Sequence, residues 1–305
     1  MTTTDALAAD YGLLTREVGV VDRSERGKLA LTGPERKPFL HGQVTNDVEG
    51  LVPGTGCYAA FLTAKGKMQG DLRILDTGDE LWLDTERSTL QGLFTMIHRY
   101  KVGARVELQK RTLQQGLLSL IGPAARDVAP IDGPEHANRL ADGILYVATD
   151  TGVDLVCDAA RTEELKRSLG VPEVSEAAAE IVRVEHGRPR FGLDMGETTI
   201  PQEAGLNDRA VSFTKGCYVG QETVARLHYR GKPNRHLRGL RLGAPVAAGT
   251  ELRLGEKPVG TVATSVVSPA FGPIALALVR REAQAGDVLD AGGISATVVE
   301  PPFAA

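Results

Sequence analysis

The sequence predicts an α+β protein that ends in a small all-β domain. Helical periodicity alternates with strand-like alternation over residues 1–232, whereas short apolar stretches separated by glycine and proline follow Pro233. At roughly 100–200 residues per domain, 305 residues allow two or three domains. We expect a domain boundary near residue 236.

Amphipathic periodicity predicts the helices. In the clearest case, Leu90, Leu93 and Ile97 recur on one face of residues 89–100. Ser175 is a residue type that caps helix N-termini, and it precedes an apolar-periodic run that continues to Glu185. The other helices are expected over residues 5–14, after Pro34, and over residues 161–169.

Apolar runs of strand length, bounded by turn residues, predict the strands. A hairpin turn is expected at residues 64–67, and the glycine-rich run 187–220 is long enough to be a functional loop. In the first part of the chain we expect strands at 28–33, 57–63, 68–75, 80–84, 106–108, 117–121, 144–147 and 153–156. In the C-terminal domain we expect them at 237–242, 259–267, 274–279 and 296–299.

Charge and cysteine content restrict the possible ligands. The 39 acidic and 35 basic residues give a net charge of −4, which excludes a globally basic nucleic-acid-binding protein but leaves room for a local basic groove. Three cysteines without CxxC spacing favour a reducing compartment and predict neither a disulfide framework nor a metal site. Without a signal-like start or a membrane-length apolar run, we expect a soluble cytoplasmic protein whose partners include no nucleic acid and no membrane.

The densest candidate site is the run KGCYVGQE, residues 215–222. Two glycines let the backbone turn tightly there, and Lys215 places a cation two residues before Cys217. A nearby cation lowers the pKa of a thiol and raises its thiolate fraction, so Cys217 is a candidate nucleophile. The alternative is a buried, inert cysteine in a structural turn.

Two further segments carry candidate binding groups. Glu185 lies at a predicted helix C-terminus, where a carboxylate is unfavourable against the dipole and needs a partner. It could accept two parallel N–H bonds from an amidine-like ring edge, or it could be a surface acid paired with Arg183. Residues 226–236 form a basic run suited to a polycarboxylate or phosphate, or simply a solvated charged face. The chain contains no P-loop, GxGxxG or GxSxG motif.

The run KGCYVGQE resembles the signature of the YgfZ family of folate-binding proteins. The opening run 20–48 and the C-terminal run 260–303 are also similar to that family, and residues 183–206 resemble a stretch of the glycine cleavage T-protein. The resemblance implies a three-domain α+β cloverleaf of the T-protein type around a central folate pocket. Its implied parts are a folate-binding core of residues 1–48 plus about 110–235, a ferredoxin-like insert of residues 49–109, and a C-terminal β-barrel of residues 236–305.

The same resemblance implies tetrahydrofolate as the cofactor and a set of site residues. By position, Glu185 matches the pterin-binding glutamate of the superfamily, and Cys217 matches the signature cysteine. The T-protein carries an acidic pair, of which only Asp71 remains here, because Gly70 stands in the other place. The remaining candidates for contacts to the cofactor are Lys215, Tyr218 and Gln221 of the signature, and Arg226 and Arg230 for the folate glutamate tail.

Three hypotheses for the function follow. The resemblance implies an accessory protein that binds tetrahydrofolate and supports the assembly or repair of iron–sulfur clusters, with client enzymes or assembly proteins as partners and Cys217 as a thiolate. The alternative is a folate-dependent aminomethyltransferase of the glycine cleavage type that uses Asp71. The third is a non-catalytic module that binds a partner through its barrel.

Overall fold

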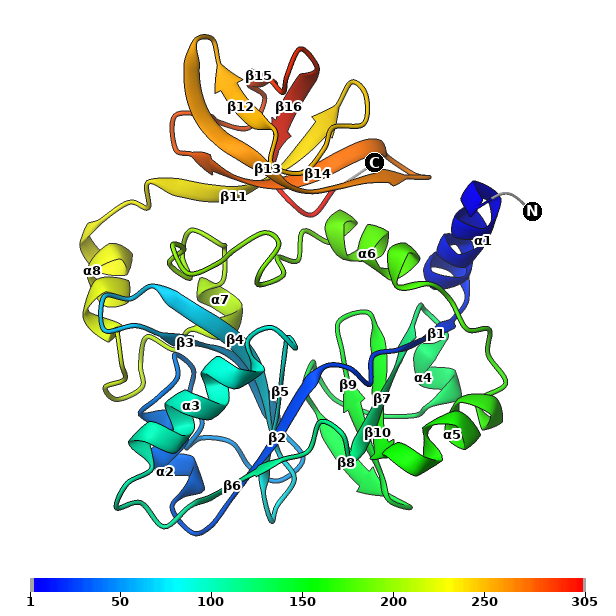
Figure 1. The fold of residues 1–305 in the computed structure, drawn as a ribbon, viewed down its shortest axis with the longest axis vertical. Coiled ribbons are helices and arrows are strands. Elements are labelled where there is room, and N and C mark those ends of the chain that lie inside the picture. The colour runs from blue at the N-terminus through cyan, green and yellow to red at the C-terminus, as the bar shows by residue number, and fades with distance from the viewer. Residues whose placement is uncertain (1–2, 304–305) are drawn as a thin grey trace.

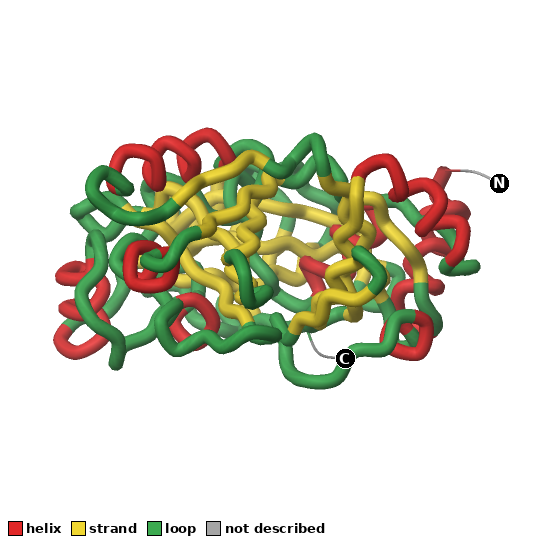
Figure 2. The backbone as a smooth tube through the Cα atoms, turned by 90° about the horizontal axis from the view of Figure 1, so that it is seen from below, coloured by secondary structure: helices red, strands yellow, loops and turns green. Residues whose placement is uncertain are grey.

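The computed structural model describes residues 3–303. Over these residues the chain forms two five-stranded antiparallel sheets and one closed barrel. Figure 1 shows the sheets as two lobes below the barrel, with helix α6 (Glu176–Glu185) between the barrel and the second sheet. Seen from below, strands occupy the middle of the molecule and helices its periphery (Figure 2). The expected α+β class with a C-terminal barrel is confirmed.

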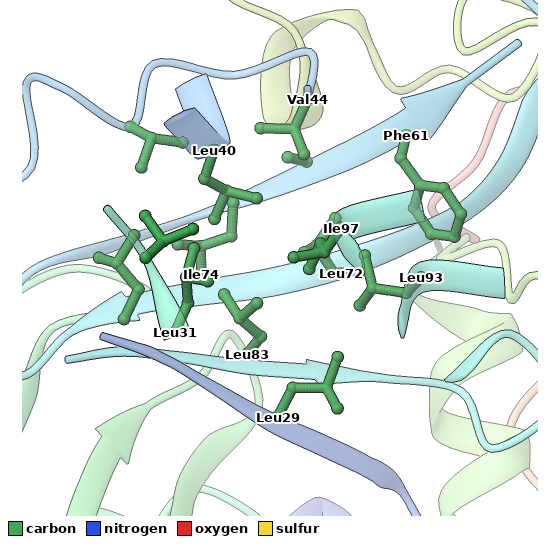
Figure 3. Packing of buried hydrophobic residues seen from close by; sticks show 14 of the residues in the cluster. Leu29, Leu31, Leu40, Val44, Phe61, Leu72, Ile74, Leu83, Leu93 and Ile97 are labelled. Carbon is green, nitrogen blue, oxygen red and sulfur yellow. The ribbon is translucent and has the colours of Figure 1, made fainter. Parts of the chain in front are cut away.

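The first sheet has the strand order β3-β4-β5-β2-β6 and is covered on one face by two helices. Leu29, Leu31, Leu72 and Ile74 project from this sheet into a cluster with Leu93 of the covering helix α3 (Figure 3). The elements are β2 (Gly27–Thr32), α2 (Arg36–His41), β3 (Gly56–Leu62), β4 (Met68–Asp76), β5 (Leu81–Thr85), α3 (Leu90–Tyr100) and β6 (Glu107–Lys110).

The second sheet has the order β1-β7-β10-β9-β8. Its apolar face, which includes Leu118, Leu120 and Leu155, packs with residues of two short helices and the turns beside them. The elements are β1 (Gly19–Asp22), β7 (Gln115–Ile121), α4 (Ala125–Val128), β8 (Asn138–Ala141), β9 (Ile144–Ala148), β10 (Gly152–Asp158), the 3₁₀ turn Ala159–Arg161 and α5 (Thr162–Ser168).

The two sheets meet through a separate apolar cluster. Leu75 and Trp82 of the first sheet pack against Leu117 and Val156 of the second. The buried Trp82 indole also donates a hydrogen bond from Nε1 to Oε1 of Gln115 at 2.9 Å, which satisfies its polar atom. Strands alternate their side chains between faces, so β4 presents residues 70, 72 and 74 to the helices and residues 71, 73 and 75 toward the second sheet.

Helix α6 contacts three different parts of the molecule. Ser175 caps it as expected, because its hydroxyl accepts a hydrogen bond from the Ala178 amide. Ala178 and Ile181 pack on α1 (Thr3–Arg16), whereas Val184 packs on the barrel. A third face, which includes Val182, is turned toward the space between the sheets.

Residues 187–234 wrap the first sheet before the barrel begins. They contain the short helix α7 (Asn207–Ala210) and α8 (Gln221–Arg230), and the intervening loops bury Ala204, Leu206 and Tyr218 against β3 and β4. The barrel follows in the order β11-β14-β13-β12-β15-β16. Its strands are β11 (Arg235–Leu242), β12 (Glu251–Leu254), β13 (Lys257–Ser268), β14 (Gly272–Arg280), β15 (Val288–Asp290) and β16 (Ser295–Val299).

One strand belongs to a different sheet from the one that the expected domain ranges imply. Residues 1–48 were expected to join residues 110–235, and β1 does pair with β7. However, β2 pairs with β5 and β6, so it completes the sheet built from residues 49–109. Within residues 3–303, no helix is both long and apolar enough to cross a membrane.

Candidate functional site

A cavity of about 250 Å³ lies between the two sheets and is closed by α6. Strands β4 and β5 contribute Asp71, Arg73 and Asp84 to its wall. Strands β7 and β10 contribute Ser119 and Asp154. The remaining lining includes Val182, Arg183 and His186 of α6, together with Arg188, Arg190 and Arg209 from the segments that follow it. The wall is therefore polar and rich in arginine.

Asp71 is buried in this wall and is bonded to a tyrosine. The Tyr58 hydroxyl donates a hydrogen bond to its carboxylate, and the Arg209 guanidinium lies 5.3 Å from the centre of the Tyr58 ring. Burial raises the pKa of Asp71 to about 6, against the opposing effects of the Tyr58 hydrogen bond and the Arg26 charge. A carboxyl with such a pKa can exchange a proton near neutral pH.

Paired ions form the wall behind Asp71. Asp84 lies between Arg26 and Arg73, at 2.8 and 2.5 Å, and these guanidinium groups hold the pKa of its carboxyl well below the usual range despite burial. Arg73 also contacts Asp154 of the second sheet at 2.7 Å, so one side chain joins both sheets. Within the described residues, the charges of Asp84 and Asp154 are therefore neutralised by arginines of the same chain.

Other cavity arginines keep part of their surface exposed. The side chains of Arg188 and Arg190 are 36% and 27% exposed. Arg188 contacts Asp150, whereas Arg190 contacts Glu86 at 3.0 Å and lies farther from Glu176 and Glu180, at 3.5 and 3.8 Å. A guanidinium has five donors, so the single carboxylate partner of Arg188 leaves donors for a second anion, and Arg190, which forms one close ion pair, also keeps donors. Sequence analysis missed these residues; the only available signal was their closeness in the run RPR at 188–190, just after Glu185.

Glu185 does not line this cavity. Its carboxylate is 7% exposed and accepts hydrogen bonds from the hydroxyls of Tyr11 at 3.2 Å and Ser268 at 2.5 Å. Its backbone oxygen accepts a hydrogen bond from the Phe303 amide. Burial is the main cause that raises the pKa of Tyr11 to about 12, and the neighbouring Glu185 carboxylate is the second. The expected need for a partner is met from α1 and the barrel, and Arg183 pairs instead with Glu180 and Asp194.

The signature run is anchored by Lys215 and Tyr218. The Lys215 ammonium donates to the backbone oxygens of His41 and Val44 and lies 4.8 Å from the centre of the Tyr218 ring. Burial lowers the pKa of Lys215 to about 8 and raises that of Tyr218 to about 12. Gly220 has φ 85°, and a side chain there would meet the Thr63 oxygen at 2.5 Å. The run is therefore fixed against the β3–β4 hairpin.

This anchoring leaves Cys217 exposed. The cation expected to activate it is directed elsewhere, because Lys215 is bonded to two carbonyl oxygens and its charge acts on Cys57. Burial raises the Cys57 pKa to about 12, with Lys215 opposing that rise. Cys157 is buried. Of the three thiols, Cys217 is thus the accessible one.

The remaining predicted residues lie on α8, away from the cavity lining. Gln221 begins this helix. Arg226 is 72% exposed and pairs with Glu222 at 3.0 Å, and Arg230 is exposed at the helix end. The structure therefore brings Asp71 into the cavity but distributes Glu185, Cys217 and the two arginines over three other places. In the described part of the chain, no group of three or more His, Cys, Asp or Glu side chains could hold a metal ion.

Comparison with known proteins agrees with this architecture. Residues 1–131 match the GCVT N-terminal domain, and residues 235–305 match the CAF17 C-terminal β-barrel domain. The chain joins these two domains. The resemblance to the YgfZ family and the T-protein superfamily is thereby confirmed.

Curated relatives and a solved structure extend the likeness over most of the chain. An Arabidopsis thaliana protein, named as a chloroplastic transferase, is 27% identical over 94% of this chain and 72% of its own length. The tRNA-modifying protein YgfZ of Photorhabdus laumondii is 28% identical over 83% of this chain and 81% of its own. Aminomethyltransferase T of the glycine cleavage system from Bartonella henselae shares the fold, with a TM-score of 0.88, 21% identity, and coverage of 98% of this chain and 89% of its own. The T-protein fold with a closed C-terminal β-barrel is therefore established.

Replacing Asp71 by Asn tests the protonation of the cavity wall. The native pKa of about 6 exceeds the usual unfolded value near 4, so wild-type stability decreases as pH rises between those values and is then constant. Asp71→Asn should lack this decrease and gain on the order of 1–3 kcal/mol relative to wild type between pH 4 and 7. Denaturant unfolding at four pH values measures this difference in the free energy of unfolding. Asp79→Asn, which changes an exposed acid, is the control. Parallel stability curves for wild type and Asp71→Asn would contradict the assignment.

Proposed function

We propose that this protein binds tetrahydrofolate in the cavity between the two sheets and acts as an accessory protein for the assembly or repair of iron–sulfur clusters. The cavity itself carries the proposal, because it sits between the sheets of a T-protein fold and is lined by partly exposed arginines and by buried carboxyls, of which Asp71 is bonded to a tyrosine and not to an arginine. This lining suits a ligand with a polar ring and a carboxylate tail.

The tail of tetrahydrofolate ends in carboxylates, which fit the cavity arginines better than those of α8. Arg188 and Arg190 are partly exposed within the cavity and can donate to a further anion, Arg188 with one acidic partner of the chain and Arg190 with three. Arg226 and Arg230 were the residues expected from sequence, but neither lines the cavity. We therefore assign the tail to Arg188 and Arg190.

Two carboxyls are candidates for the amidine-like edge of the pterin. Asp71 is favoured by geometry, because it lies in the cavity wall. Glu185 is favoured by the resemblance, and its carboxylate, with about four acceptor positions, accepts two hydrogen bonds from this chain. Binding through Glu185 requires it to turn from Tyr11 and Ser268 toward the cavity face of α6.

Calorimetric titration with tetrahydrofolate distinguishes Asp71 from Glu185 as the ligand of the pterin edge. A hydrogen bond to a charged group contributes about 1.5–3 kcal/mol, so removing the charge of the true ligand should raise Kd by roughly 10–100-fold. Asp71→Asn and Glu185→Gln retain an acceptor oxygen for Tyr58 or for Tyr11 and Ser268, and only one of them should weaken binding.

A matched pair of variants tests the assignment of the folate tail. Arg188→Ala should weaken tetrahydrofolate binding, whereas Arg226→Ala, which removes an exposed arginine of α8, should not. A wild-type protein without saturable binding would refute the folate proposal and favour the partner-binding module.

The accessory role assigns Cys217 to partner proteins, because it is the exposed thiol and lies outside the cavity lining. Its thiolate can attack a disulfide of a client or assembly protein, which forms a mixed disulfide and releases the partner's other sulfur as a thiolate. The free cysteines of this chain suit a reducing compartment, and we place the protein in the cytoplasm.

Complementation tests the thiol. In cells that lack the native gene, Cys217→Ala should restore iron–sulfur enzyme activity less well than wild type. Cys57→Ala, which removes a thiol held protonated by burial, should restore it fully. Full complementation by Cys217→Ala would exclude a role for this thiol in cluster assembly or repair.

Aminomethyl transfer is the second candidate, and the position of Asp71 in the cavity favours it. Strand alternation turns residue 70 away from Asp71, and a side chain at Gly70 would meet the Phe61 ring at 2.5 Å. A second acid is thus excluded from that strand position by packing. Formation of methylene-tetrahydrofolate from an aminomethyl-lipoyl donor, abolished by Asp71→Asn, would establish transfer. Turnover at background level would remove it.

A further inference from the structure

Four positively charged side chains lie where α8 meets the barrel, and none of them is paired with an acid of the described residues. Arg230 and Lys232 lie at and just after the end of α8, and Arg280 and Arg281 lie at the end of β14. The two segments adjoin, since the Arg281 amide donates to the Asn234 oxygen at 2.9 Å and Arg280 is the register partner of Arg235. All four side chains are exposed, and over residues 3–303 none of them forms an ion pair.

Acidic side chains do little to cancel this charge. Arg235 is held by Glu203 at 2.9 Å, and Glu222 on the first turn of α8 is held by Arg226 at 3.0 Å. Glu282 is the acid that follows Arg281 directly. The four cations thus carry no ion pair within residues 3–303 and have one acid directly adjacent in sequence, in a chain whose net charge is −4.

An exposed aromatic platform lies on the same helix. The rings of Phe213 and His228 are stacked with centroids 3.7 Å apart, and Tyr229 meets His228 edge-on at 4.8 Å. Tyr229 is nevertheless 67% exposed. The two rings hold the position of Tyr229 while leaving much of its surface in solvent, so it is ordered without being buried.

We propose that this basic-aromatic surface, formed by Tyr229, Arg230, Lys232, Arg280 and Arg281, binds single-stranded RNA. Cations that follow a phosphate backbone, together with an aromatic ring that stacks on a base, are the combination by which proteins hold single strands. RNA is favoured because its loops and ends present unpaired bases. The net charge had indicated no nucleic-acid partner, but that value averages away a local excess. None of these residues lines the cavity, so the proposal is independent of folate binding.

Fluorescence anisotropy with a labelled oligouridylate of roughly 16 nucleotides, the upper end of known site sizes, provides the test. Wild-type binding should be saturable and salt-dependent. Removing two phosphate contacts in Arg230→Ala/Lys232→Ala should make the negative slope of log K against log salt shallower by about 1.4, at about 0.7 per contact. Tyr229→Ala should weaken binding about tenfold without changing that slope, and Tyr229→Phe should retain affinity.

Lys257→Ala is the matched control, because Lys257 is exposed on the barrel hairpin β12–β13 and forms no ion pair within the described residues. It should bind like wild type. Absence of wild-type binding, or equal binding by all variants, would overturn the proposal. So would displacement of the RNA by poly-L-glutamate together with full affinity of Tyr229→Ala, since the surface would then recognise an acidic protein.

Discussion

The ion pairs of Arg73 with Asp84 and Asp154 hold the two sheets at a fixed separation around the cavity. The Leu75–Trp82 cluster packs the sheets together on one side of these pairs, and the cavity occupies the other. Loss of one partner would leave a buried charge unpaired, which is strongly destabilising, so all three side chains are needed to keep this junction of the sheets. It also satisfies the internal acids, so that Asp71 is left with a hydroxyl partner and a raised pKa.

Helix α6 lies where the sequence predicted it, but its sequence position alone did not indicate toward which neighbours the Glu185 side chain points. The sequence predicted its limits and its serine cap, and placed Glu185 at its C-terminal end. The helical repeat of 3.6 residues then turns Val182 and His186 into the cavity and Glu185 toward Tyr11 and Ser268. The position of Glu185 at a helix C-terminus indicated an acid that needed a partner, but its partners are Tyr11 of α1 and Ser268 of β13, the latter 83 residues away along the chain.

The fold was more predictable than the site because its signals are local. Alternation revealed most strands, and the change of composition after Pro233 revealed the barrel. Cavity groups instead depend on pairs distant in sequence, such as Arg190 with Glu86 and Arg209 with Glu135. No periodicity encodes those pairs, and β2 illustrates the same limit, since its short apolar run is compatible with either sheet until its hydrogen-bonded partners are known.

The signature run is fixed at Lys215 and Tyr218 and leaves the Cys217 thiol exposed. Burying Lys215 is costly for a charge, and its two carbonyl acceptors and the Tyr218 ring offset that cost. Those acceptors belong to the chain around α2, so the anchor ties the loop to the first sheet while Cys217 remains in solvent. Folate in the cavity and a protein at Cys217 therefore need not compete. One connection between them runs through the strands β3 and β4, which carry Tyr58 and Asp71 at one point and hold the signature loop at their hairpin end.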